Sequence, residues 1–233
     1  MAGLTPAPYL SIIIPTYQEA TFIGPLVSHC LAQKGVLEVI VVDAASPDKT
    51  AKIAHEHGAD VHPAIKPGRA PQMNQGAKAA KGPVLHFIHA DSWPPVDFPK
   101  AIAEAVQQDY AAGCFRSRFV TTNRFLLANS YLTRFSGIVF RGGGQTLFCT
   151  AECFRQVGGY NNELMVMEEY DLIQRLKSHT AFRIIPENVQ VSARKYSQHG
   201  AIRLQLAYAV IFVLFFLGLS QSRLISLYKR LIS

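Results

Sequence analysis

Residues 36–50 read VLEVIVVDAASPDKT, and this stretch decides the fold class of the chain. Residues 36–42 are almost continuously apolar and rich in valine, which is typical of a strand buried on both faces of a parallel sheet. The run ends at Asp43, and the Ala, Ser and Pro that follow predict a turn into a helix that begins near Thr50. The stretch therefore predicts a strand followed by a helix, the repeating unit of an α/β domain.

The segments on either side repeat this alternation. Strand-like runs alternate with helical patterns at residues 9–14, 19–31, 36–42, 50–57, 60–62, 74–81 and 84–89. The order predicts a mostly parallel sheet with right-handed crossovers, flanked by helices. Ligands of such sheets bind at the carboxyl ends of the strands.

The rest of the chain continues with strands and helices in mixed order. We expect helices at 94–108, 151–157 and 168–178, strands at 113–120, 146–149 and 182–185, and a loosely helical connection at 121–140. No repeat or low-complexity linker interrupts this part. We therefore predict one domain over residues 1–200 and a separate helical tail over residues 201–233.

The composition is that of a globular protein in a reducing compartment. Of 233 residues, 49% are hydrophobic and 17% charged, which excludes a disordered or collagen-like chain. The four cysteines have no spacing that suits a zinc knuckle, and they are too few for a disulfide framework in a chain of this length. The N-terminus lacks the pattern of a signal peptide, so we expect the main domain in the cytoplasm.

Residues 194–233 carry most of the net charge of +7, because they contain six basic residues and no acidic ones. Residues 204–222 are uncharged, and their apolar part, residues 204–219, is close to the lower limit of roughly 17 residues for a membrane-spanning helix. After it, one helical stripe of apolar side chains lies beside bases, as in a helix at a membrane surface: Leu224, Leu227, Tyr228 and Leu231. We predict contact with the cytoplasmic side of the membrane, peripheral or single-pass. A helix that closes a soluble core and a dimer interface are the alternatives.

Polar residues gather at the predicted strand ends. Asp43 closes a buried strand, where a carboxylate can bind a base or ribose, whereas Asp48 suits the cap of the next helix. Residues 66–76 read KPGRAPQMNQG and place Arg69 and Asn74 before a helix. A guanidinium and backbone amides there suit a diphosphate, and a solvated loop is the alternative.

Two further clusters contain carboxylates. Residues 88–95 read IHADSWPP, and on an extended segment the side chains of His89 and Asp91 would point the same way and could hold Mg²⁺ or Mn²⁺. The alternative for His89 is a hydrogen-bonded core histidine. Glu168, Glu169 and Asp171 begin a predicted helix, where they either stabilise the helix dipole or supply a general base.

In this order the motifs resemble those of the family 2 glycosyltransferases, which have the GT-A fold. They are PTYQEA, VVDAASPDKT, GRAPQMNQGAKAAKG, HFIHADSWPP, GGYN and MEEYDLIQRLK, and the similarity runs over residues 10–176. The GRA segment, the HAD motif and the tail motif LGLSQSRLISLYK are most similar to a bacterial branch, the arsenosugar-biosynthesis-type glycosyltransferases.

The resemblance implies a role for each matching residue. Those implied to line the nucleotide-sugar pocket are Pro15, Thr16, Glu19, Asp43, Arg69, Asn74 and Gln145. Asp43 would bind the base or ribose, and Arg69 with Asn74 would flank the diphosphate and ribose. Gln145 follows Gly144, where relatives carry Asp, so one acceptor-side carboxylate is missing.

The resemblance also assigns the metal and the base. The Asp-x-Asp motif of the family occurs here as His89-Ala90-Asp91, so Asp91 would coordinate a divalent metal, Mn²⁺ or Mg²⁺, with His89 assisting or merely adjacent. The catalytic Glu-Asp pair occurs as Glu168-Glu169, which puts Glu169 in the place of the general base, one methylene longer than Asp.

The expected function is inverting transfer of a sugar from a nucleotide-diphosphate sugar, with a UDP-sugar favoured, to an acceptor hydroxyl. The tail favours an acceptor at the inner face of the membrane, lipid-linked or soluble. A catalytically inactive GT-A-fold membrane scaffold and a nucleotide-binding protein are the alternatives. A nucleotidyltransferase is not supported, because the chain lacks a glycine-rich pyrophosphate loop after its first predicted strand. Nucleic acid is excluded as a partner, because the excess of bases lies in the hydrophobic tail.

Overall fold

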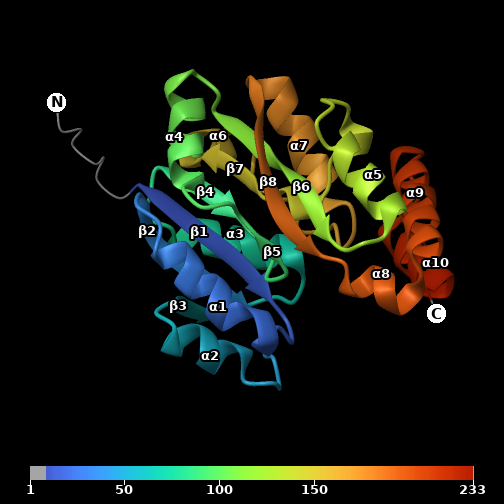
Figure 1. The fold of residues 1–233 in the computed structure, drawn as a ribbon, viewed down its shortest axis with the longest axis horizontal. Helices are drawn as coiled ribbons and strands as arrows, with labels where there is room; N and C mark the ends of the chain where they lie inside the picture. Colours follow the sequence, from blue (N-terminus) through green and yellow to red (C-terminus); the bar gives the residue numbers. More distant parts are fainter. Residues whose placement is uncertain (1–8, 233) are drawn as a thin grey trace.

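The computed structural model describes residues 9–232, and its centre is one eight-stranded sheet of order β3-β2-β1-β4-β7-β6-β8-β5 (Figure 1). The strands are β1 (Leu10–Thr16), β2 (Val36–Asp43), β3 (Asp60–Pro63), β4 (Val84–Phe87), β5 (Ser92–Trp93), β6 (Ala112–Val120), β7 (Leu147–Thr150) and β8 (Phe182–Ser192). All the strands in the order belong to one continuous hydrogen-bonded sheet.

The first four strands are parallel, as the sequence predicts. β1 pairs with β2 on one side and β4 on the other, with Ile13 opposite Ile40 and Phe87. β2 pairs in parallel with β3. The carboxyl ends of β1, β2 and β4 therefore lie at the same edge of the sheet.

The second half of the sheet is mixed, which corrects the prediction of a mostly parallel sheet. β7 runs antiparallel to both β4 and β6, β8 is parallel to β6, and β5 is antiparallel to β8. The hydrophobicity of a buried strand is the same in either direction, so the pattern along the sequence does not encode strand direction.

Helices cover both faces of the sheet. They are α1 (Ala20–Leu31), α2 (Thr50–Glu56), α3 (Arg69–Ala79), α4 (Phe98–Gln107), α5 (Arg124–Leu132), α6 (Ala151–Gln156) and α7 (Glu168–His179), with two short 3₁₀ turns at Ile138–Phe140 and Gly143–Gln145. Alternation along β1 sends Ile12 and Ile14 into a core with α1 and α4, and Ile13 into a second core with α3, α6 and α7.

Helix α3 approaches the sheet closely because Gly76 has no side chain. A Cβ atom at this position would lie 2.5 Å from Cγ2 of Ile13. The helix begins at Arg69, five residues before the start that the sequence suggested, so Arg69 lies in its first turn rather than in a loop. The structure also contains β5, α5 and a short helix after β8 that the pattern did not resolve, and β8 runs on to Ser192.

The tail forms three helices, α8 (Arg194–His199), α9 (Ala201–Phe216) and α10 (Gln221–Ile232), at one end of the molecule (Figure 1). α10 packs against α9: the rings of Tyr208 and Tyr228 stack with centroids 5.9 Å apart, and Nε of Arg203 donates to the carbonyl of Leu231 at 2.8 Å. None of the helices between residues 9 and 232 combines the length and the apolar character that crossing a membrane requires.

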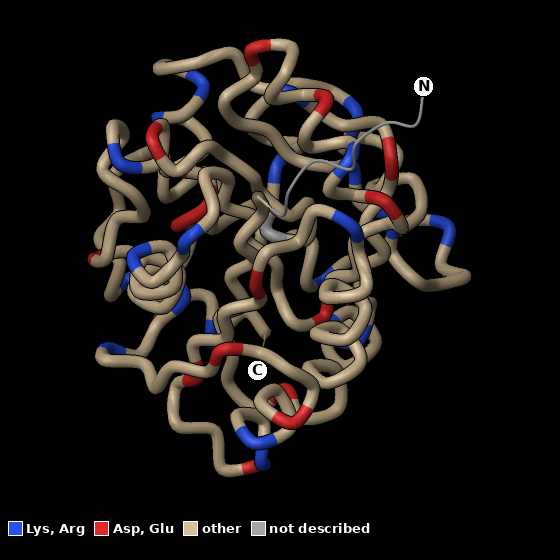
Figure 2. Tube along the Cα trace, turned by 90° about the vertical axis from the view of Figure 1, so that its left-hand side faces the viewer, with Lys and Arg blue, Asp and Glu red and all other residues tan. Residues whose placement is uncertain are grey.

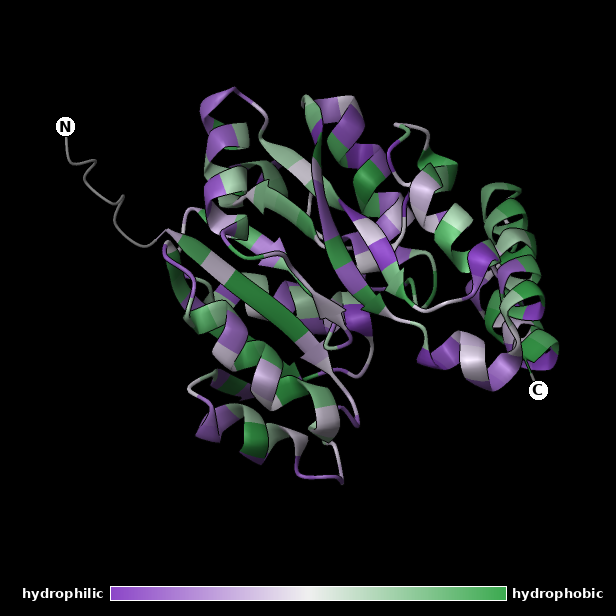
Figure 3. Ribbon diagram, viewed as in Figure 1, coloured by the Kyte–Doolittle hydropathy of each residue, from purple (hydrophilic) through white to green (hydrophobic). Residues whose placement is uncertain are grey.

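This hairpin changes the interpretation of the tail. The apolar stripe of α10 packs partly against α9: Leu224 is fully buried, whereas Leu227, Tyr228 and Leu231 stay partly exposed. The exposed apolar side chains lie on α9 instead, where residues three or four positions apart share one face: Ile202, Leu206, Val210, Val213 and Phe216, with Leu217 beside them. Figure 3 shows α9 hydrophobic along most of its length. In the rest of the chain, acidic and basic residues are interspersed (Figure 2).

Candidate active site

Asp43, at the carboxyl end of β2, is tightly bound to its own loop. Its Oδ1 accepts hydrogen bonds from Oγ1 of Thr16 (2.8 Å) and Oγ of Ser46 (2.6 Å), and its Oδ2 accepts one from the Ser46 amide (2.8 Å). Nε2 of Gln72 donates to the carbonyls of Thr16 and Val42 and ties α3 to both strand ends. Asp43 is buried, so these contacts hold the loop after β2 in shape.

Pro15 and Asp48 both make contacts that support the fold. Pro15 is buried in β1 opposite Val42. Asp48 accepts hydrogen bonds from the amides of Ala20 and Thr50 and from Oγ1 of Thr50, so it joins the starts of α1 and α2, as expected of a capping residue. The hydrogen bond from the Thr50 hydroxyl is the main cause that lowers the pKa of Asp48.

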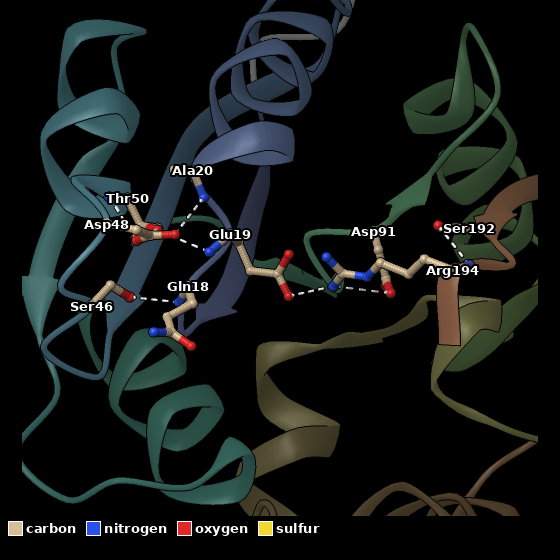
Figure 4. Close-up of polar contacts among 9 residues, drawn as sticks. All are labelled: Gln18, Glu19, Ala20, Ser46, Asp48, Thr50, Asp91, Ser192 and Arg194. Carbon is tan, nitrogen blue, oxygen red and sulfur yellow. Dashed lines mark hydrogen bonds and ion pairs between the residues drawn. The ribbon is translucent and has the colours of Figure 1, made fainter. Parts of the chain in front are cut away.

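Glu19 and Asp91 are brought together by Arg194, a residue from the far end of the chain (Figure 4). Nη2 of Arg194 lies 2.6 Å from Oε1 of Glu19 and 3.4 Å from Oδ2 of Asp91. Glu19 precedes α1, Asp91 follows β4, and Arg194 begins α8. Three segments that are distant in sequence thus meet at the carboxyl edge of the sheet.

His89 and Asp91 do not share an extended segment, contrary to our expectation. β4 ends at Phe87, and the chain then turns, with the Ser92 amide donating to the carbonyl of His89 at 3.0 Å. Nε2 of His89 contacts Oε1 of Glu169, whereas Asp91 faces Arg194. The turn directs two neighbouring side chains to different partners, and the role of His89 at a metal stays a prediction.

Glu168 and Glu169 begin α7 and have opposite electrostatic surroundings. Burial raises the pKa of Glu168, and the adjacent charge of Glu169 raises it further, against the effect of Arg69, whose Nη1 lies 3.6 Å from Oε1 of Glu168. Burial is the largest single influence on Glu169 and opposes its charge, but the interactions with His89, Arg69 and Lys195 together outweigh burial and lower the pKa of that carboxyl. Glu169 is therefore the more acidic of the two carboxyls.

The side chains of Asn74 and Gln145 both form hydrogen bonds with other residues of the chain. Asn74 donates to the Tyr160 carbonyl (2.8 Å) and to Oδ1 of Asn162 (2.9 Å), and it accepts from the Tyr160 amide (2.9 Å). Nε2 of the buried Gln145 donates to the carbonyl of Phe140 at 2.8 Å. Gln145 also lines a cavity of about 10 Å³ together with Glu169 and Tyr160, so it is close to the carboxylate that could act as base.

Sequence reasoning missed two cations of the site, Arg194 and Lys195. Lys195 is close enough to Arg69, Arg194 and Glu169 to interact with their charges, and burial, followed by Arg69, lowers its pKa. The available signal was the pair of adjacent bases directly after a strand. By sequence alone, both residues count with the basic, membrane-facing tail. The fold instead places them beside the strand ends.

A divalent metal has a partial set of ligands here. Among residues 9–232 no three His, Cys, Asp or Glu residues are arranged around one point as a metal would need. Glu19 and Asp91 nevertheless supply carboxylate oxygens on either side of one cation, and Oε2 of Glu19 is buried without a hydrogen-bond partner in this part of the chain. Such oxygens suit Mn²⁺ or Mg²⁺, which complete their coordination with water and phosphate oxygens.

Fold and site together define an α/β protein with charged side chains gathered at the carboxyl ends of its parallel strands. The model of the family described as glycosyl transferase family 2 matches residues 11–156, more than half of the chain, and the chain belongs to this family.

The curated relatives are distant and longer. An uncharacterized glycosyltransferase of Rickettsia conorii is 24% identical over 221 residues, covering 82% of this chain and 35% of the relative. The uncharacterized glycosyltransferase EpsJ of Bacillus subtilis is 28% identical over 109 residues, 44% of this chain and 31% of that relative. The chain thus spans about a third of the length of these curated relatives.

Solved glycosyltransferases share the fold. The mannosyltransferase PcManGT of Pyrobaculum calidifontis, in complex with GDP-Man and Mn²⁺, has a TM-score of 0.65 at 20% identity, over 89% of this chain and 63% of that one. TarS of S. aureus, in complex with UDP-GlcNAc, has a TM-score of 0.63 at 16% identity, over 79% of this chain and 58% of that one. These similarities confirm the GT-A fold.

Proposed function

We propose that this chain is an inverting glycosyltransferase that moves a sugar from a nucleotide-diphosphate sugar to an acceptor hydroxyl. The observation that carries the proposal is the contact of Glu169 with His89, at the same sheet edge as Asp91 and Arg69. Family membership and the fold support it. The arsenosugar branch remains a prediction from the motifs.

The protein groups divide between the acceptor and the donor. Glu169 takes the proton of the acceptor hydroxyl as the hydroxyl oxygen attacks the anomeric carbon, and the bond from that carbon to the diphosphate breaks. Arg69 faces the leaving diphosphate, whose negative charge grows as the bond breaks, so its guanidinium stabilises the transition state more than the ground state. Asp43 and its loop shape the base and ribose pocket.

Asp91 is the proposed metal ligand, with Glu19 as the second nearby carboxylate. A bound Mn²⁺ or Mg²⁺ would supply positive charge to the diphosphate. PcManGT is described in complex with Mn²⁺, as is a glucosyl-3-phosphoglycerate synthase of Mycobacterium tuberculosis that resembles this fold with a TM-score of 0.53. We extend this cofactor to the present chain as part of the proposal.

We further propose that the tail places the protein on the inner face of the cytoplasmic membrane. The exposed apolar face of α9, including Ile202, Leu206 and Val213, supplies the contact with lipid. The chain has no acidic residue after position 193, so anionic headgroups meet only basic partners there. This location favours a lipid-linked acceptor, although a soluble acceptor that reaches the membrane surface fits the same site.

The test of the proposed function is calorimetric titration of the protein with UDP and with GDP, each with and without Mn²⁺. We expect metal-dependent binding of one nucleotide, with UDP favoured, and loss of that binding in Asp91→Ala. The control is Asp60→Ala, which removes an exposed carboxylate of β3 that pairs with His62. Failure of both nucleotides under every metal condition would refute the transferase and favour the inactive scaffold, for which the missing carboxylate at Gly144 is the supporting observation.

A further inference from the structure

Arg194 lies between two carboxylates that the sequence separates widely. One guanidinium nitrogen contacts both Glu19 and Asp91 (Figure 4), and the guanidinium carbon lies 4.7 Å from the centre of the Phe22 ring. The side chain of Arg194 is 30% exposed, and those of the two acids are 17% and 19% exposed. The three charges are therefore held in a partly buried place where screening by water is weakened.

The arrangement has the electrostatics of a cation site. Two carboxylates near one point repel each other unless a cation lies between them. Arg194 is the cation that forms ion pairs with both acids, with the charges of Lys195 and Arg69 farther away, and it leaves Oε2 of Glu19 buried without a partner among the described residues. A divalent ion would neutralise both acids and could use the oxygen that the guanidinium leaves unpaired.

We propose that Arg194 is a displaceable counter-ion: it holds the cation position between Glu19 and Asp91 in the donor-free protein, and a divalent metal reaches these carboxylates only by displacing it. The inference rests on the proposed function through the metal at Asp91. Metal and guanidinium compete because both are positive and use the same carboxylate oxygens. The competition makes metal binding weak until another anion is present.

A nucleotide diphosphate would remove this barrier. The displaced guanidinium loses two carboxylate partners, and a diphosphate offers it new ones of the same charge. Arg194 is the first residue of α8, and its long side chain is 30% exposed, so a change of partners requires only rotation about its side-chain bonds in this inference. Metal and donor are thereby expected to bind together rather than independently, which is a coupling between two ligands.

The test measures Mn²⁺ binding in the absence of nucleotide, by calorimetry and by the electron paramagnetic resonance signal of free Mn²⁺. We expect Arg194→Gln to bind Mn²⁺ about tenfold more tightly than the unmodified chain, since it removes the competing charge. Arg194→Lys keeps the charge and should bind Mn²⁺ as weakly as the unmodified chain. Adding Asp91→Asn to Arg194→Gln should abolish the gain, which locates the metal.

The matched control is Arg155→Gln, which breaks the exposed ion pair of Arg155 and Glu152 on α6. This helix packs in the second core, on the other face of the sheet from α1. The Mn²⁺ affinity of Arg155→Gln should not change. Equal or weaker Mn²⁺ binding in Arg194→Gln, or no Mn²⁺ binding in any variant, would overturn the inference. Thermal unfolding of each variant shows whether it is folded. If Arg194→Gln is less stable than the unmodified chain, its Mn²⁺ affinity is compared with that of Arg194→Lys, which keeps the charge.

This outcome is separable from the proposed function. Nucleotide binding with unchanged Mn²⁺ affinity in Arg194→Gln would refute the counter-ion and leave the transferase intact. A gain in Mn²⁺ affinity without any nucleotide binding would establish the counter-ion and refute the transferase.

Discussion

At the scale of single residues, the contrast between Glu168 and Glu169 is the most informative feature of the site. The two carboxylates are adjacent in sequence, but one faces Arg69 at 3.6 Å and the other contacts His89. Their pKa values move in opposite directions, because two buried neighbouring acids do not both ionise readily. From the residues alone, spacing did not choose a base among the acids that begin α7. The contact with His89 favours Glu169.

We predict that Glu169→Gln lowers turnover by roughly 10²–10⁴-fold, because it removes proton transfer from the acceptor while keeping the size of the side chain. The measurement is release of nucleoside diphosphate from the donor sugar in the presence of a bacterial lipid extract. Donor binding by calorimetry should change little, which shows that the pocket is intact. A larger loss of turnover in Glu168→Gln than in Glu169→Gln would assign the base to Glu168 instead.

At the scale of elements, the hairpin of α9 and α10 connects the tail to the site. Gln221 of α10 accepts hydrogen bonds from the amides of Met165 and Val166, just before α7, and the Tyr170 ring of α7 packs against Phe212 of α9 with centroids 5.3 Å apart. The hairpin thus supports the start of the helix that carries Glu169. A surface bound by α9 would therefore lie close to the start of α7, where Glu169 is located.

We predict that a triple variant of the α9 face, Ile202→Ser, Leu206→Ser and Val213→Ser, loses at least about tenfold in binding to phosphatidylglycerol-containing vesicles. Burying an aliphatic side chain contributes roughly 1.5–3 kcal/mol, so three losses exceed that factor. The measurement is co-sedimentation with vesicles.

The control for this face is Ile65→Ser, Val96→Ser and Val120→Ser, which changes apolar side chains elsewhere in the chain that are as exposed or more so. It should bind vesicles like the unmodified chain. If the unmodified chain stays in the supernatant and gel filtration shows a dimer that the α9 variant dissociates, the face is a dimer interface and the membrane proposal is wrong.

At the scale of the whole molecule, stability should depend on pH through His86, which lies fully buried in β4 between the rings of Phe98 and Phe115. Burial lowers the pKa of His86 to about 3 from its ordinary value of 6.5. The unfolded chain therefore binds a proton that the folded chain rejects. The free energy of unfolding is unaffected by this residue above about pH 6.5 and falls as the pH drops from there towards 3.

We predict that His86 accounts for roughly 2 kcal/mol of the free energy of unfolding lost between pH 7.5 and pH 5, on the pKa shift just given. The free energy of unfolding of His86→Leu should therefore fall by roughly 2 kcal/mol less than that of the unmodified chain over the same pH range. The measurement is urea unfolding at both pH values. His55→Gln, at an exposed position of α2, is the control and should follow the unmodified chain. Identical pH dependence in His86→Leu and the unmodified chain would contradict the prediction.

Much of the fold was predictable because its signals are local. The apolar run of residues 36–42, the helical spacing in α1 and the turn residues after Asp43 depend on neighbours along the chain, so they identified the parallel half of the sheet. Strand direction in the second half was not predictable, because β7 and β8 have the same hydrophobicity in either orientation. The start of α3 was placed late because Pro71 in its first turn resembles a loop residue.

The sequence predicted which residues form the candidate site, but it did not predict which side chains they contact. Strand ends and the resemblance to a family selected Glu19, Asp91 and Glu169, but the turn after β4 separates His89 from Asp91. The pairing of α10 with α9 likewise buries Leu224 and leaves the more exposed apolar face on α9. Each of these outcomes depends on contacts between segments far apart in the chain.

The sequence by itself determined that this is an α/β chain of the glycosyl transferase family 2, with acids and bases at the carboxyl ends of its strands. Only the tertiary structure decided that Arg194 lies between Glu19 and Asp91, 175 residues from the first of them along the chain. The reason is physical: periodicity and turn chemistry act between neighbouring residues, whereas a salt bridge across the sheet edge requires the whole chain to have folded.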